Sequence, residues 1–480
     1  MKPTALRLLA TSSAAALLLA GWAGAATRPH YGGTLRVFLG AAPDAGQAGS
    51  FSLTGAGAEF TAGNAGSLAS LVFDTLVMAD DNGGLEPGLA LSWSSDAGFR
   101  RWQFRLRPGV KFHSGEPLTA AAAAASLTAV VPGCRASLFE PRPLSEQPGL
   151  LESGGAGESV VVECDAPHPE LAAQMASPSA AISHRSSAGA LEGTGPFRLS
   201  SWQPGSRAVF TAFEGCWAGR PYLDTIEITM HQDLRDQQLA LQLGRADVVE
   251  ASPGQPISGV RVSASAPAKL VALVFSENSA AVADERVRQA FSLAADRATI
   301  AGILLQGAAE PAWGVLPNWI SGYEFLFRGA NDEARARQLR AEARAGAPIT
   351  VAVAASGDAQ LRLVAERIVL NARDAGFDVQ LTADLRRADA AITAVPLGSA
   401  DPGAALVTAA ELLRRPRPQF QDASLTAAWQ AERSMLAGTW IVPIVHAGAA
   451  WALSPRVHDW AARRDGRWRL DEVWLEDSVK

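Results

Sequence analysis

The chain has few cysteines and lysines, and it lacks the sequence motifs of the common enzyme classes. It contains three cysteines in 480 residues, too few for a disulfide scaffold, and its Cys and His spacing is not that of a zinc site. Its formal net charge is −6, so we expect no nucleic-acid partner. Only four of its 42 basic residues are lysines, and no basic cluster accompanies the excess of arginine. The sequence lacks a GxSxG elbow, a P-loop lysine, an HExxH helix and an SxxK pair. We therefore expect no enzyme, no metal and no cofactor.

The first residues have the three-part form of a secretory signal peptide. A basic start precedes the apolar residues 8–20, and Ala23-Gly24-Ala25 is a small-x-small cleavage signal. The apolar run is shorter than the ~20 residues that span a bilayer. Trp22 stands where a bacterial lipoprotein would need its cysteine. These features predict a soluble periplasmic protein that begins near Ala26 and carries no lipid.

The rest of the chain, 48% hydrophobic overall, has the patterns of a globular α/β protein. Its length predicts about three domains. A β-branched run, an amphipathic helix, the helix-ending Gly376 and an alternating strand follow one another in the order of α/β architecture. Strands are expected at 33–39, 102–106, 349–353 and 377–381, and helices at 120–125 (capped by Thr119), 284–300 and 361–368.

Several groups of residues occur in an order typical of one family. They are residues 72–76 (VFDTL), 85–90 (LEPGLA), 104–119 (FRLRPGVKFHSGEPLT), 193–197 (GTGPF), 217–224 (WAGRPYLD), 243–248 (LGRADV) and 284–290 (DERVRQA). Together they resemble the extracellular solute-binding proteins of family 5, the oligopeptide, dipeptide and nickel receptors of ABC importers. The resemblance covers residues 30–320, is loose over 330–430 and returns at 441–444.

The resemblance implies an α/β fold of two lobes joined by a hinge, with an extra domain on the first lobe. It places lobe I at 27–60, 190–268 and 440–480, the extra domain at 61–189 and lobe II at 269–439. Such a receptor is a monomer that closes on a solute and delivers it to a permease and its ATPase. A secreted hydrolase and a sensing module without transport are the alternatives.

The family's receptors bind an extended peptide as an added strand, which predicts contacts along exposed strand edges. A short peptide or similar solute is therefore the expected ligand, with a metal chelate or an oligosaccharide as alternatives. The candidate ligand-binding residues are Gly40, Ala41 and Ala42 after the first strand, Ser276, where the family usually has Asn, Trp313, Ala394 within the edge 392–395, and Asp401.

Two of these candidates have simpler alternatives. Asp401 could meet a cationic amino terminus, or it could only begin a turn with Pro402 or cap the following helix. Trp313 and Trp319 lie on a segment expected to face the cleft, although Trp313 could equally be part of the core.

A disulfide between Cys134 and Cys164 is expected within the extra domain. The compartment is oxidising, and Cys164 ends the predicted strand 160–163. The alternative is that all three cysteines are small buried thiols.

Overall fold

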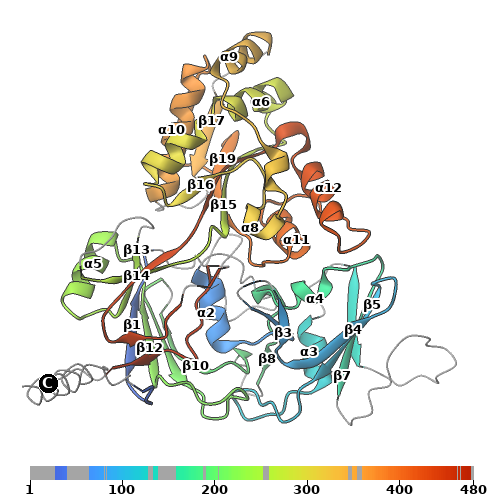
Figure 1. Ribbon diagram of the computed structural model, residues 1–480, viewed down its shortest axis with the longest axis vertical. Coiled ribbons are helices and arrows are strands. Elements are labelled where there is room, and N and C mark those ends of the chain that lie inside the picture. The colour runs from blue at the N-terminus through green and yellow to red at the C-terminus, as the bar shows by residue number, and fades with distance from the viewer. Residues whose placement is uncertain are drawn as a thin grey trace, which may run out of the picture.

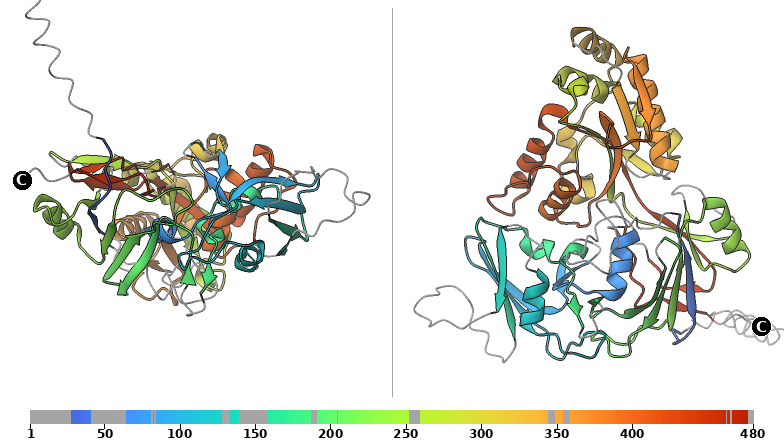
Figure 2. Two further views of the ribbon diagram at one scale, coloured as in Figure 1. Left: turned by 90° about the horizontal axis from the view of Figure 1, so that it is seen from below. Right: turned by 180° about the vertical axis from the view of Figure 1, so that it is seen from behind.

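The computed structural model describes residues 28–40, 64–80, 82, 84–127, 133–138, 158–186, 191–203, 205–251, 259–343, 349–353, 359–461, 463–464 and 466–476. They form two lobes, each built on its own mixed sheet, and a smaller four-stranded sheet that lies beside the first lobe (Figure 1, Figure 2). The predicted two-lobed α/β fold is confirmed. The predicted signal peptide lies outside the described residues. Among the described helices, none has the length and apolar character needed to cross a bilayer.

The first lobe contains a seven-stranded sheet with the strand order β10-β11-β12-β1-β13-β21-β14. β1 is parallel to both of its neighbours and is buried through Leu35 and Val37, which are 0% exposed. Asp233 caps α5 by accepting the N–H of Asp236. The bounds are β1 Thr34–Phe38, β10 Phe197–Gln203, β11 Arg207–Ala212, β12 Thr225–Thr229, α5 Leu234–Gln242, β13 Val248–Ala251, β14 Arg261–Ala264 and β21 Ala450–Leu453.

The second lobe contains a six-stranded sheet with the order β16-β20-β15-β19-β17-β18, covered by helices. Its strands are β15 Lys269–Phe275, β16 Ala309–Pro311, β17 Ile349–Val353, β18 Val379–Thr382, β19 Ala390–Pro396 and β20 Ile441–Ala447. Its helices are α6 Glu285–Ala294, α7 Arg297–Thr299, α8 Asn318–Ser321, α9 Glu333–Glu342, α10 Ala359–Asp374, α11 Pro402–Leu412 and α12 Leu425–Met435.

The helix predicted over 284–300 is shorter than expected. α6 ends at Ala294, because Ala295 takes an extended conformation. The side chain of Asp296 then accepts the N–H of Thr299 and starts a new short helix. An Asp that bonds nearby backbone competes with helix continuation, which explains the break.

The extra domain is a four-stranded antiparallel sheet with the order β4-β5-β7-β6. Its elements are β4 Ala90–Ser95, β5 Arg101–Leu106, α3 Ala120–Leu127, β6 Cys134–Leu138, β7 Ser159–Cys164 and α4 Leu171–Gln174. Thr119 caps α3 as predicted, accepting the N–H of Ala122 at 3.2 Å. Cys134 and Cys164 lie opposite each other on β6 and β7 and form the predicted disulfide.

The smaller elements lie between these bodies or at the edges of the first lobe. They are α2 Asn64–Val72, the pair β2 Val77–Ala79 with β3 Leu85–Pro87, the pair β8 His184–Arg185 with β9 Leu191–Glu192, and the pair β22 Val457–His458 with β23 Trp474–Leu475.

The glycine pair Gly193 and Gly195 allows close packing at the end of α2. Gly195 N–H donates to Val72 O at 2.9 Å, and Gly193 O accepts from His113 N–H at 3.0 Å. A Cβ at Gly193 would lie 1.9 Å from Val72 O. The intervening Thr194 donates its hydroxyl to Asp74 at 2.8 Å. This segment therefore joins the extra domain and α2 to the first lobe. The close packing explains why residues 193–197 (GTGPF) contain two glycines.

The chain crosses between the two large sheets at residues 265–268 and again at 448–449. The crossings lie against each other: Ser265 N–H donates to Ala449 O at 2.8 Å, and Ala449 N–H donates to the Ser265 hydroxyl at 2.9 Å. A Cβ at Gly448 would lie 2.9 Å from Ser265 O, so glycine permits this approach.

The expected return to lobe I at residue 440 is too early. β20 lies between β16 and β15 in the second sheet, and all seven of its residues are buried. Its β-branched, apolar sequence suits an interior strand of that sheet. The second crossing therefore follows Ala447.

Candidate functional site

Two of the contacts between the lobes involve whole segments of the described chain. One is the pair of crossing segments, and the other is where α4 of the extra domain contacts α11 of the second lobe. The boundary between them is the candidate ligand site, because groups there can change partners when the lobes move.

Trp319 belongs to this boundary, whereas Trp313 is packed within the second lobe. The indole N–H of Trp319 donates to Pro267 O, in the first crossing segment, at 2.8 Å. Arg464, from the first lobe, lies 5.8 Å from the centre of its ring. The Arg297 guanidinium covers the ring of Trp313 at 3.8 Å, and a Cβ at Gly329 would come within 2.4 Å of that ring. Trp313 is nevertheless half-buried, and a ligand contact for it remains a prediction.

Glu432 and His446 hold the segment that carries both tryptophans. Glu432, 0% exposed, accepts the backbone N–H groups of Val315 and Leu316 at 2.5 and 3.1 Å. His446 Nε2 lies 3.1 Å from Val315 O. Burial raises the pKa of Glu432 to about 7 and lowers the pKa of His446 to about 4. Both side chains are thus favoured in their neutral forms, as burial away from water requires.

Glu432→Gln should change how the stability of the protein depends on pH. Because the pKa of Glu432 is raised to about 7 in the folded chain, its stabilising contribution is complete below its ordinary pKa of 4.5 and is lost as the pH rises through 7. Relative to wild type, the variant should therefore gain stability between pH 5 and pH 8. Denaturant unfolding at several pH values measures this. Parallel stability profiles of the two proteins would contradict it.

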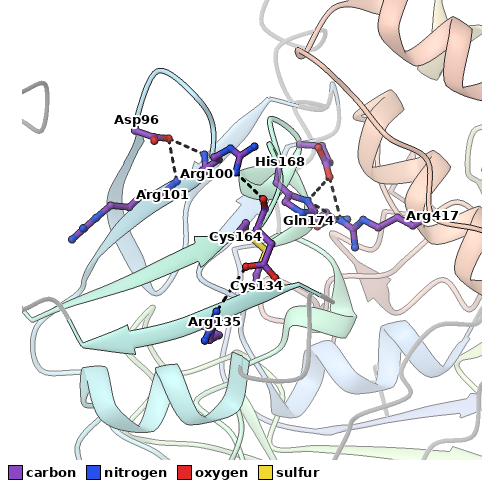
Figure 3. The surroundings of a disulfide bond; sticks show 11 residues. Asp96, Arg100, Arg101, Cys134, Arg135, Cys164, His168, Gln174 and Arg417 are labelled. Atoms are coloured by element: carbon purple, nitrogen blue, oxygen red, sulfur yellow. Dashed lines mark hydrogen bonds and ion pairs between the residues drawn. A yellow bond between two sulfur atoms is a disulfide. The ribbon is translucent and has the colours of Figure 1, made fainter.

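Arg417 connects the second lobe to the extra domain (Figure 3). Its Nη2 lies 3.2 Å from Glu170 Oε1, 3.0 Å from Gln174 Oε1 and 3.3 Å from His168 Nδ1. The Glu170 side chain is 5% exposed and that of Arg417 is 16% exposed. Burial alone would raise the pKa of Glu170, but His168, a backbone N–H and Arg417 outweigh it, so this pKa lies below its usual value. Glu170 is therefore held as a carboxylate against Arg417.

The first predicted binding edge is partly occupied. Gly40 N–H donates to Glu250 Oε2 at 2.8 Å, and a Cβ at Gly40 would lie 2.8 Å from the same oxygen. This N–H is therefore engaged within the first lobe. Ala41 and Ala42 lie outside the described residues.

The second predicted edge is open over part of its length. β19 pairs with β15 along all of residues 390–396 and with β17 along 390–392, so Ile392 is not on an edge. Ala394 pairs with Val271 on one side. Residues 393–396 have no second strand partner among the described residues. Leu397 N–H donates to Ala268 O at 3.0 Å, which places this stretch beside the first crossing.

Asp401 caps a helix, and Ser276 lies away from the crossings. Asp401 Oδ1 accepts the N–H of Ala404 at 2.8 Å and begins α11, which is the simpler of its two expected roles. Burial raises its pKa, the cap N–H opposes this, and the charge of Glu170 adds to it. Ser276 follows the far end of β15 and donates its N–H to Asp389 O at 2.9 Å. A ligand contact for either remains a prediction.

Arg417 and Glu170 are boundary residues that sequence patterns did not indicate. The stretch 414–418 (RRPRP) could have indicated Arg417, because two prolines restrict the backbone on either side of it. The sequence around Glu170 has no pattern that indicates its role, because its partner Arg417 lies 247 positions away in the chain.

Two cavities lie near these elements. One, of about 630 Å³, opens beside Arg417 between the segment 415–424 and α12. The other, of about 380 Å³, lies between α2 and the segments 216–222 and 463–472 of the first lobe. Neither is lined by residues of both lobes.

Comparison with known proteins relates this chain to a family of binding proteins. A family profile described as bacterial extracellular solute-binding proteins, family 5 Middle, matches residues 84–393. The nickel-binding protein NikA of Staphylococcus aureus is 22% identical over 249 residues, which are 50% of this chain and 49% of that protein. The dipeptide-binding protein of Escherichia coli is 25% identical over 276 residues, 49% of this chain and 50% of that protein. These alignments span about half the length of the curated relatives.

Solved structures are similar over a greater length. The dipeptide-binding protein of Pseudoalteromonas sp. SM9913 in complex with Met-Leu superposes with a TM-score of 0.76 at 16% identity, covering 92% of this chain and 100% of that one. The NikA of Staphylococcus aureus in complex with Ni(L-His)2 gives a TM-score of 0.72 at 15% identity, with the same coverage of 92% and 100%. At such identities the likeness shows a shared fold, and the profile match over more than half of the chain adds the family. The chain belongs to the bacterial extracellular solute-binding proteins of family 5.

Proposed function

We propose that this chain is the substrate-binding receptor of an ABC importer and that it captures a short peptide or a similar small solute between its lobes. The observation that carries the proposal is the pair of adjacent crossing segments, joined by the Ser265–Ala449 hydrogen bonds, between two separately packed lobes. Two short connections let lobes rotate without unfolding either core. The function is then binding and closure, with no bond made or broken.

Several features favour a ligand with a peptide-like backbone. Residues 393–396 of β19 present main-chain groups beside the first crossing, and Ala394 adds little side-chain bulk there. A peptide added to this edge would gain main-chain hydrogen bonds whatever its sequence. Asp401 begins α11, which contacts β19, and its carboxylate is the candidate partner for a cationic amino terminus. A metal chelate is the second candidate, since two of the relatives are named as nickel-binding proteins.

The site of action and the partners follow from the same proposal. The predicted signal peptide would direct the chain to the periplasm, where cleavage near Ala26 would release it without a lipid anchor. A monomer in its closed form would then dock on a permease that works with an ATPase.

Calorimetry with unliganded protein tests the ligand class. We expect heat of binding from di- to pentapeptides, and none from Ni(L-His)2 or from oligosaccharides. Asp401→Asn, which keeps the helix cap, should weaken peptide binding about tenfold if the carboxylate meets the amino terminus. Binding of the chelate or sugar alone would overturn the peptide proposal. Unchanged peptide affinity in the variant would remove only the role of Asp401.

A further inference from the structure

The contact between Arg417 and Glu170 joins the second lobe to the extra domain through several polar side chains. Glu170 occupies the N-cap position of α4, yet its side chain makes no capping hydrogen bond there. Its carboxylate instead accepts a hydrogen bond from Arg417 across the boundary. His168, two residues earlier, places Nδ1 3.2 Å from the same oxygen. With Gln174, the extra domain thus directs three polar side chains at Arg417.

Two prolines restrict the backbone that carries Arg417 on the second lobe. Pro416 and Pro418 flank it, and each proline fixes its own φ, while Pro418 also restricts the backbone of Arg417. Less conformational entropy is therefore lost when the guanidinium binds its partners. On its own lobe, Arg417 Nη1 lies 3.9 Å from Glu411, so the cation keeps one carboxylate neighbour if the lobes separate.

The close approach of α4 and α11 depends on a small residue. A Cβ at Gly403, in the first turn of α11, would lie 3.1 Å from Glu170 Cβ. Glycine here lets the helix start lie directly against Glu170. Because the N-terminus of an 11-residue helix carries partial positive charge, it adds to the attraction of Arg417 for this carboxylate.

Two acidic side chains, Glu170 and Asp401, lie at the same boundary as the cation of Arg417. The charge of Glu170 contributes to the raised pKa of Asp401 across the same boundary, after the larger effect of burial. Without Arg417, its cation would no longer offset the charges of these two carboxylates from opposite lobes, and the contact would weaken.

We propose that Arg417 and Glu170 form a latch that stabilises the closed arrangement of the lobes without touching the ligand. Only the effect of the latch on ligand affinity rests on the proposed function. If a solute binds the closed form, its apparent affinity falls in proportion to the closed fraction when the latch is weakened. The latch itself is a property of the unliganded protein.

Single-molecule energy transfer between the lobes tests the latch without any ligand. Dyes attached through non-natural amino acids at Ser114 of the extra domain and Gln338 of α9 leave the disulfide intact, and both positions are exposed. Arg417→Met should raise the ratio of open to closed molecules about tenfold, and Glu170→Gln should act in the same direction. The double variant should open no further than the stronger single variant, because both substitutions remove one interaction. Arg417→Lys should keep part of the closed population.

The matched control is Arg362→Met, which removes an ion pair with Glu366 inside α10. It should leave the open-to-closed ratio unchanged. An unchanged ratio in Arg417→Met, or an equal shift in the control, would overturn the latch. Since no solute is present, failure of every peptide in calorimetry would not affect this result. Conversely, the latch variants could bind peptide while their ratio of open to closed molecules stays that of the wild type. That result would contradict the latch and support the receptor function.

Discussion

Gly193→Ala should unfold the junction between the extra domain and the first lobe. The added Cβ would lie 1.9 Å from Val72 O and 2.6 Å from Phe73 Cδ1, and the first of these is backbone that cannot move aside as a side chain can. The hydrogen bonds of Gly193 and Gly195 to His113 and Val72 would have to break to make room. We expect a loss of about 3 kcal/mol or more, at the upper end for overpacked sites.

Thermal unfolding measures this effect. Gly302→Ala is the matched control, because a Cβ there would meet nothing within 4 Å and its backbone needs no positive φ. The control should melt with the wild type, while Gly193→Ala should melt well below it or fail to accumulate as folded protein. A melting temperature of Gly193→Ala equal to that of the control would contradict the proposed packing.

Removal of the disulfide should strongly destabilise the extra domain. Cys134 and Cys164 close a loop with a sequence separation of 30, for which the chain-entropy model gives about 3–4 kcal/mol. Cys134→Ser with Cys164→Ser should therefore speed amide hydrogen exchange in β6 and β7 far more than in the sheet of the second lobe.

Cys216→Ser is the control for this pair. Cys216 is a half-buried free thiol, and burial raises its pKa to about 11, so it is not expected to react or exchange readily. Thiol titration of the denatured, non-reduced protein should find one free thiol. Three free thiols would contradict the disulfide.

The elements that sequence patterns predicted best are those with strong local signals. β1 and β5 alternate between buried and half-buried positions as their sequences indicate, and Thr119 caps α3. The cysteine pair was predictable because the compartment and a strand end both pointed to it. In each case the deciding interaction lies within a few residues or depends on composition.

The predictions that failed depend on contacts that a periodic pattern does not report. The helix from residue 284 ends early because the Asp296 side chain accepts the N–H of Thr299, a local bond that competes with the helical pattern. The return to the first lobe comes after β20 because that strand pairs with β15, a partner more than 150 residues earlier in the chain. Arg417 and Glu170 meet only when two lobes are placed against each other. A periodicity within one segment contains no information on such a contact.

Small-angle scattering with and without a peptide that binds tests the central claim most directly. If this chain is a two-lobed receptor that closes on its solute, the radius of gyration should decrease when the peptide is added. Tryptophan emission should change in the same titration, because Trp319 contacts both Pro267 in the first crossing and Arg464 of the first lobe. An unchanged radius at saturating peptide in a protein that starts with separated lobes would contradict closure, and with it the proposed mode of action.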